Sequence, residues 1–174
     1  IGIAVQVAEG LQHAYLNGLV HRDVKPENVM LLPDGGVKLL DLGLARPTDE
    51  EVTRLTRTGM FVGTPFYASP EQVMGRADID IRTDIYSLGA TLYHMLTGRP
   101  PFSGASAMEV LRKHIHEQLP WPADINPQIS SAMCRVIARA MAKSTDDRYR
   151  EPRDFANDLE AIRSGKAVTV TNDV

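Results

Sequence analysis

The chain has 174 residues, of which 43% are hydrophobic and 24% are charged, a composition typical of one globular domain with a well-buried core. Its formal net charge of −3 at pH 7 argues against a nucleic-acid-binding surface, and no apolar run approaches the length that crosses a bilayer. A single cysteine, Cys134, excludes an intrachain disulfide and favours a reducing compartment.

The first predicted element is a helix over residues 3–16. Apolar side chains recur there at helical spacing, at Ile3, Val7, Leu11, Ala14 and Tyr15. The dipeptide Asn17-Gly18 follows as a stop signal, so we expect the helix to end there.

A β-hairpin is predicted next. Two short apolar runs, residues 29–32 and 37–40, flank the turn sequence Pro33-Asp34-Gly35-Gly36. Such a hairpin would place Asn28 at the entrance of one strand and Asp41 at the exit of the other. Both side chains could then face one site.

The rest of the chain reads as a long loop followed by helices. Residues 45–64 are polar and threonine-rich without a steady period, which indicates a functional loop. A buried helix follows, with its apolar stripe at Ile85, Leu88, Leu92 and Leu96 and its end at Thr97-Gly98. Further amphipathic segments are expected at about 105–117, 127–142 and 152–163, and residues 164–174 show no core pattern. The order predicts an α+β fold that is mostly α-helical, with one small β-hairpin.

Three other polar residues are expected to have no catalytic role. Cys134 lies among apolar neighbours and reads as a buried small hydrophobe. His114 and His116 are two residues apart, so they face different sides of a predicted helix and a metal site there is not expected.

The chemistry of the chain is concentrated in residues 21–28, His-Arg-Asp-Val-Lys-Pro-Glu-Asn, together with Asp41-Leu42-Gly43. This short region holds a carboxylate, an ammonium, a carboxamide and a second carboxylate, which a magnesium nucleotide site needs. The ordered combination resembles the catalytic loop and the metal-binding loop of protein kinases. With the predicted helices, the whole resembles the C-terminal lobe of a eukaryotic-like (Hanks-type) bacterial serine/threonine kinase, with the hairpin at the catalytic and metal loops.

The resemblance implies a role for each residue of this region. Asp23 would be the catalytic base, and Lys25 would stabilise the charge of the transferring phosphate. Asn28 and Asp41 would hold Mg²⁺, and Met30 would form the floor of the adenine pocket of ATP. The structural alternatives are a turn aspartate for Asp23, a turn residue for Asn28, a helix cap for Asp41 and core packing for Met30.

Two residues of the same loops have expected packing roles. Leu42 stands where phenylalanine is most common in the family, and it would pack against His21. His21 is therefore expected to be a packed structural residue and not an acid or base.

Regulation is expected to involve Arg22. A guanidinium beside a catalytic carboxylate needs an anionic partner, which a phosphothreonine on the long loop would supply. The loop offers Thr53, Thr56 and Thr58, and the resemblance to activation loops of bacterial kinases favours autophosphorylation of Thr56 and Thr58.

The segment Gly63-Thr64-Pro65-Phe66-Tyr67 and the following Ser69-Pro70-Glu71 resemble the substrate-docking segment of the family. Thr64 would hydrogen-bond toward Asp23 and Lys25. Lysine at position 25, with Pro-Glu-Asn after it, is typical of serine/threonine kinases and not of tyrosine kinases.

Three further residues are expected to hold the scaffold. Glu71 would form a buried ion pair with Arg148, and Asp84 would anchor the backbone of the catalytic loop from inside the buried helix. Breaking such a buried pair is costly.

The sequence contains no Gly-x-Gly-x-x-Gly loop and no strand such as Val-Ala-Ile-Lys, which in the family form the nucleotide-covering lobe. We therefore expect residues 1–163 to be a partial kinase domain without its N-terminal lobe, and 164–174 to begin a linker. The chain would be either a piece of a longer protein or a natural lobe-only form, and it would be inactive alone.

The resemblance implies transfer of the γ-phosphate of ATP to protein Ser or Thr hydroxyls, regulated by activation-loop autophosphorylation. Expected partners are protein substrates and a second kinase molecule in a dimer for trans-autophosphorylation, with no nucleic acid and no membrane segment in this chain. The expected location is the cytoplasm, either as a cytoplasmic protein or as the cytoplasmic domain of a membrane-anchored parent. The alternatives are a non-catalytic pseudokinase or docking module, disfavoured by the intact catalytic set, and a small-molecule phosphotransferase, disfavoured by the docking segment.

Overall fold

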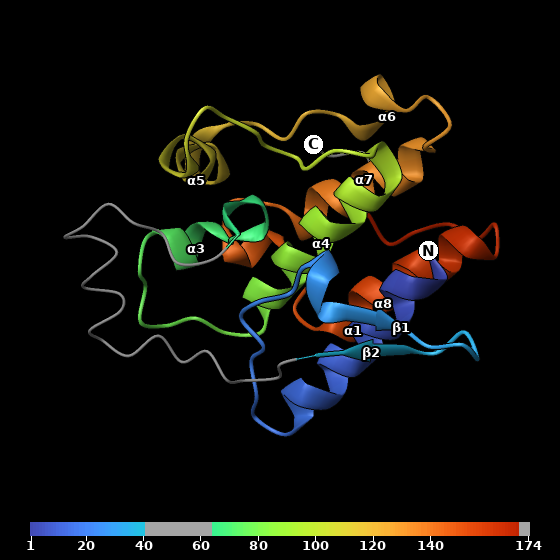
Figure 1. Cartoon of the computed structure of the whole chain (residues 1–174). Coiled ribbons are helices and arrows are strands. Elements are labelled where there is room, and N and C mark those ends of the chain that lie inside the picture. The colour runs from blue at the N-terminus through green and yellow to red at the C-terminus, as the bar shows by residue number, and fades with distance from the viewer. Residues whose placement is uncertain (41–63, 171–174) are drawn as a thin grey trace.

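The computed structural model describes residues 1–40 and 64–170, and it is mostly helical with one small antiparallel sheet (Figure 1). The α-helices are α1 (Gly2–Leu16), α3 (Pro70–Val73), α4 (Arg82–Thr97), α5 (Ala107–His116), α6 (Pro122–Ile125), α7 (Ser131–Ala140) and α8 (Pro152–Arg163). The strands are β1 (Val29–Leu31) and β2 (Val37–Leu39), and the 3₁₀ turns are η1 (Pro26–Asn28), η2 (Pro65–Tyr67) and η3 (Thr145–Asp147). The predicted α+β class is confirmed.

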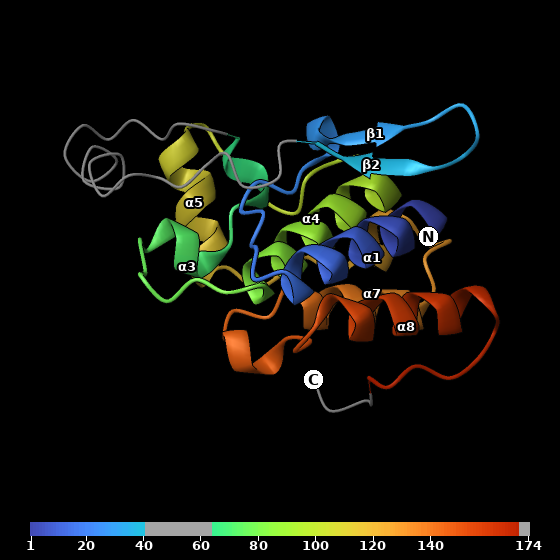
Figure 2. The same ribbon diagram turned by 90° about the horizontal axis from the view of Figure 1, so that it is seen from below.

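Helix α1 lies between the hairpin and α8 (Figure 2). Its buried face is formed by the apolar residues Ala4, Val7, Ala8, Leu11 and Ala14. The helix ends at Asn17, and Gly18 follows with φ of 71°, a left-handed conformation that glycine adopts without strain. The helix predicted over residues 3–16, with its stop at Asn17-Gly18, is thereby confirmed.

Helix α4 is the centre of the core, and every residue from Thr83 to Tyr93 is buried. A Cβ atom at Gly89 would lie 2.9 Å from the Cβ of Ala140, so glycine permits the close approach of α4 and α7. Gly98, with φ of 75°, ends the helix. Cys134 on α7 is also fully buried, and burial raises the pKa of its thiol, as expected for a small hydrophobe in the core.

One side chain of α1, that of Gln6, forms hydrogen bonds with the hairpin. In the sheet, Val29 pairs with Leu39 and Leu31 pairs with Val37. Gln6 on α1 accepts a hydrogen bond from the amide of Val37 (3.1 Å) and donates to the carbonyl of Gly35 (3.3 Å). The hairpin predicted from the sequence is therefore present, and it is anchored at both its turn and its second strand.

Helices α3 and α6 are missing from the sequence-based description. Each is a single turn that begins with proline at its first position, Pro70 and Pro122. One turn is too short to show a hydrophobic period, so pattern analysis has no signal to detect. No helix within the two described ranges combines the length and the apolar character needed to cross a membrane.

The segment after α8 differs from the expectation that it has no core pattern. Val168 and Val170 pack against the hydrophobic core. Between them, Thr169 donates its amide and its hydroxyl to the buried carboxylate of Asp158, both at 2.7 Å. Tyr149 donates to the same carboxylate at 2.9 Å. Through residue 170 the chain is therefore held by a buried polar group, which a hydrophobicity pattern does not reveal.

Candidate active site

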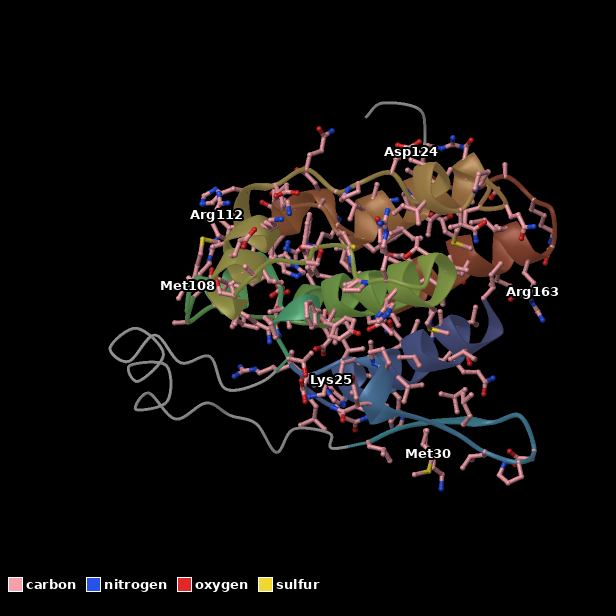
Figure 3. The ribbon with its side chains drawn as sticks, turned by 45° about the horizontal axis from the view of Figure 1, so that its top comes forward. Lys25, Met30, Met108, Arg112, Asp124 and Arg163 are labelled. Carbon is pink, nitrogen blue, oxygen red and sulfur yellow. The ribbon has the colours of Figure 1, made fainter. Side chains whose placement is uncertain are left out.

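Three side chains of the loop before the hairpin form one hydrogen-bonded group. The carboxylate of Asp23 accepts hydrogen bonds on Oδ2 from Nζ of Lys25 (2.7 Å) and from Nδ2 of Asn28 (2.9 Å). Nδ2 of Asn28 also donates to the backbone carbonyl of Asp23 (2.8 Å). The 3₁₀ turn η1 folds the chain so that these residues, spaced two and three positions apart, meet. Lys25 lies on the hairpin side of the molecule in Figure 3.

The group leaves two oxygen atoms for other partners. Among the described residues, no donor binds Oδ1 of Asp23 or Oδ1 of Asn28. The Asp23 side chain is 43% exposed, so its oxygen can reach solvent or a substrate. The amide of Asn28 directs its nitrogen at Asp23, which leaves a hard oxygen of the kind that Mg²⁺ prefers.

The backbone of this loop is held from α4. The carboxylate of Asp84, which is fully buried in the first turn of that helix, accepts the amides of His21 and Arg22, both at 2.7 Å. Burial raises the pKa of Asp84 to about 7. The two amide donors favour the charged carboxylate and so lower the pKa, but their effect is smaller than that of burial. The predicted anchoring contact is therefore present.

His21 connects the loop of residues 21–28 to the residue that follows β2. Its Nδ1 accepts the amide of Asp23 (3.2 Å), and its Nε2 lies 2.8 Å from the carbonyl of Leu40. These partners require a neutral imidazole with the proton on Nε2. His21 is 1% exposed, which agrees with the expected structural role, whereas its expected partner Leu42 lies outside the described residues.

Arg22 has a backbone conformation that is rare for its residue type. Its φ is 68°, the left-handed region that side chains other than glycine seldom adopt. Within the described ranges its contacts are made by the backbone: its amide binds Asp84, and its carbonyl accepts Nε2 of Gln72 (2.7 Å). Thr56 and Thr58, its expected phosphorylated partners, lie outside those ranges, as does Asp41.

The described part of the segment that resembles a docking segment begins at Thr64, and its turn η2 contacts α4 and α5. Tyr67 stacks on His94 of α4 and its hydroxyl lies 2.8 Å from Nδ1 of that ring. Among the hydrogen bonds of the described residues, Asp23 binds Lys25 and Asn28, and none joins Thr64 to Asp23 or Lys25, so that contact stays a prediction.

The end of the docking segment is fixed by the predicted ion pair. Nη1 and Nη2 of Arg148 donate to Oε1 and Oε2 of Glu71 at 2.7 and 2.8 Å. The other donors of the guanidinium bind backbone carbonyls, those of Ala142 (2.8 Å), Arg82 (3.0 Å) and Lys143 (3.2 Å). All five N–H groups of Arg148 are therefore satisfied. Burial raises the pKa of Glu71, but the hydrogen bonds and charge of Arg148 outweigh it, so the pKa lies below its usual value.

Two residues near this site were overlooked by sequence reasoning. Gln72 binds the carbonyl of Arg22, and Ser69 caps α3 while its hydroxyl contacts Thr83 at 2.5 Å. The only sequence signal for them is the capping-box pattern Ser-x-x-Gln at positions 69–72. That pattern predicts a helix start and says nothing about a contact 50 residues away.

His114 is a buried residue of α5. Its Nδ1 lies 2.9 Å from the hydroxyl of Tyr86, and its ring meets Phe102 edge-on at 4.9 Å. Burial, with the nearby charge of Lys143, lowers the pKa of His114 to about 3. The imidazole is therefore neutral in the folded chain.

This burial predicts that His114→Gln makes the fold less sensitive to acid. Between an ordinary pKa of 6.5 and the folded value of about 3, the unfolded chain binds a proton that the folded chain does not. The stabilisation is complete above pH 6.5 and is lost as the pH falls, by up to about 1.4 kcal/mol per pH unit. Urea unfolding should show a shallower loss of free energy of unfolding below pH 6.5 in the variant.

Two comparisons distinguish the contribution of His114 to the pH dependence from the contributions of other groups. Asp84 has the opposite sign, because its raised pKa stabilises the fold at low pH and this contribution is lost as the pH rises through about 7. His116→Gln changes an exposed residue of the same helix and should keep the wild-type slope. Equal slopes for His114→Gln and the wild type would contradict the assignment.

Met30 projects from β1 on the outer side of the hairpin, away from the helices in Figure 3. It is 44% exposed, so it is not a core residue of the described structure. An exposed apolar side chain at this position fits one wall of a site for a flat aromatic group.

Comparisons with known proteins give a consistent result. The sequence matches the family described as protein kinase domain over residues 2–156. A probable serine/threonine-protein kinase of Corynebacterium efficiens is 40% identical over 92% of this chain and 25% of its own length. A probable serine/threonine-protein kinase of Streptomyces coelicolor is 37% identical over 97% of this chain and 25% of its own length. Serine/threonine-protein kinase PknB of Mycobacterium tuberculosis is 36% identical over 95% of this chain and 26% of its own length. The chain thus spans about a quarter of the length of the curated relatives it matches.

Proposed function

The chain belongs to the protein kinase family, and from this premise we propose that the polypeptide that carries it transfers the γ-phosphate of Mg·ATP to Ser or Thr hydroxyls of proteins. The observation that supports this most directly is the hydrogen-bonded group of Asp23, Lys25 and Asn28. It brings a carboxylate, an ammonium and an amide together within one short loop, and these are residue types that phosphoryl transfer uses.

Each residue of the group has a defined task in this proposal. Oδ1 of Asp23 orients the substrate hydroxyl and accepts its proton, since Oδ2 is already bound by Lys25 and Asn28. Lys25, whose side chain is 18% exposed, stabilises the charge of the phosphoryl group as it moves to the hydroxyl oxygen. A water-poor setting for this lysine makes its charge more effective than that of an exposed one.

Asn28 and Asp41 are proposed to hold the magnesium ion, which neutralises charge on the nucleotide phosphates when bound. Oδ1 of Asn28, which accepts no hydrogen bond from residues 1–40 or 64–170, suits a hard cation, and β2 ends two residues before Asp41. Met30 is proposed to form the floor of the adenine site.

Substrate choice and regulation are proposed to follow the family pattern. Thr64 would contact the protein substrate next to Asp23. Autophosphorylated Thr56 and Thr58 would pair with Arg22, and a second copy of the kinase would carry out this reaction in a dimer. A cytoplasmic location is proposed, which the single buried cysteine supports.

The test is an assay of the polypeptide in which this chain follows the glycine-rich lobe of the family. We expect phosphate from Mg·ATP on Ser and Thr peptides, little on a Tyr peptide, and none after removal of magnesium by EDTA. Lys25→Ala should lower kcat by roughly 100-fold, since one charge that acts on the transition state is lost.

Lys38→Ala is the matched control, because Lys38 is an exposed lysine on the neighbouring strand β2. This variant should keep wild-type kcat. Transfer that persists without magnesium, or a Lys25→Ala variant as active as Lys38→Ala, would refute the proposed function.

A further inference from the structure

The peptide group between Arg22 and Asp23 has a hydrogen-bond partner at each of its polar atoms. Its carbonyl oxygen accepts Nε2 of Gln72 at 2.7 Å, and its N–H donates to Nδ1 of His21 at 3.2 Å. The preceding amide, that of Arg22, is bound by Asp84 at 2.7 Å. These contacts hold a left-handed residue immediately before the proposed base.

Gln72 reaches this peptide group from the docking segment. Its Oε1 accepts hydrogen bonds from the amide of Ser69 (3.0 Å) and from the hydroxyl of Ser69 (3.1 Å). Since these donors require an oxygen, the amide orientation is determined, and its nitrogen must face the carbonyl of Arg22. One side chain therefore joins the start of α3 to the catalytic loop.

The start of α3 is itself rigidly placed. Glu71, beside Gln72, forms the buried pair with Arg148, and the hydroxyl of Ser69 contacts Thr83 of α4. The backbone that carries Gln72 is therefore held in place by the contacts of both Glu71 and Ser69.

We propose that Gln72 is a positioning residue that sets the direction of Asp23 by holding the carbonyl of Arg22. The proposal rests on the proposed kinase function of this site and adds a link from the docking segment to the base. Loss of the link would let the peptide group rotate, which would displace the carboxylate from the substrate hydroxyl. Small misplacements of a catalytic group reduce the rate of the chemical step more than they reduce binding.

A capping role alone does not require this contact. The capping box of α3 uses only the oxygen of Gln72, and glutamate serves equally well at that position of the motif. The donor bond to Arg22 is additional. Gln72→Glu therefore keeps the cap and removes the link, while Gln118→Glu adds the same charge at an exposed position between α5 and α6.

The first experiment measures amide hydrogen exchange in the 174-residue chain by NMR. In Gln72→Glu we expect exchange at Arg22 and Asp23 to be at least about tenfold faster than in the wild type, with α4 amides within about twofold. Gln118→Glu should match the wild type throughout. Unchanged exchange at Arg22 and Asp23, or equal acceleration in α4, would overturn the proposal.

The second experiment measures kinetics in the longer polypeptide with the glycine-rich lobe. Gln72→Glu should lower kcat by about tenfold and leave KM for the peptide within about twofold, whereas Gln118→Glu should change neither. Wild-type kcat in Gln72→Glu would overturn the proposal. If the wild type itself transfers no phosphate, the proposed function is refuted, and the exchange measurement alone decides whether Gln72 holds the loop.

Discussion

Asp23→Asn should lower kcat for phosphoryl transfer by the longer polypeptide by roughly 10²–10⁴-fold, the range attributed to a general base. Asparagine keeps the shape of the side chain and can still accept from Lys25, but it cannot accept the proton of the substrate hydroxyl. Mass spectrometry should find no phosphate on Thr56 or Thr58 of the purified variant.

The loss should not come from unfolding. The side chain of Asp23 is 43% exposed, so we expect its charge to contribute little to the stability of the fold. Asp154→Asn removes the same charge from an exposed position in the first turn of α8 and should retain activity. Phosphate on Thr56 and Thr58 in purified Asp23→Asn would show that Asp23 is not the base.

Glu71→Ala should destabilise the 174-residue chain by about 3–5 kcal/mol, because it leaves the buried guanidinium of Arg148 without its counter-ion. Both side chains are nearly inaccessible, and both Glu71 oxygens are in use. For a chain of this size the melting temperature should fall on the order of 10 °C, which calorimetry would measure.

Two variants give the comparison that this result needs. Glu160→Ala breaks an exposed pair with Arg163 and should barely change the melting temperature. Adding Arg148→Met to Glu71→Ala should recover part of the lost stability, since it removes the unpaired buried charge. A double variant as unstable as the sum of the two single variants would contradict the explanation.

The pH dependence of this pair has a fixed sign. Because the pKa of Glu71 lies below its usual value in the folded chain, its stabilising contribution is present above the unfolded pKa and is lost as the pH falls through the folded one.

Sequence reasoning located the parts of this structure that follow local rules. Three features depend only on residues close in sequence, and each was therefore predictable: the apolar period of α1 and α4, the hairpin turn, and the motif around Asp23. The contacts of Asp84 and of Glu71 with Arg148 span more than 60 residues, and they were predictable because the resemblance to a family supplied the pairing.

What sequence reasoning missed depends on side-chain chemistry at long range. No sequence pattern near Gln72 indicates that its side-chain amide binds the carbonyl of Arg22. No pattern near Thr169 indicates that it donates hydrogen bonds to the buried carboxylate of Asp158. The contact of Thr64 with Asp23 that the resemblance implied does not occur among the hydrogen bonds of the described residues, where Asp23 binds Lys25 and Asn28, so it stays a prediction.

The polar attachment of Thr169 changes where a stable unit should be cut for recombinant work. A truncation after α8, at Arg163, looks natural from helix boundaries. This truncation would remove the two hydrogen bonds that Thr169 donates to Asp158 and leave only that of Tyr149. It would also expose to solvent the core surface against which Val168 and Val170 pack. Expression designs should therefore retain the chain through Val170, because the border of this lobe is set by a carboxylate and not by the end of its last helix.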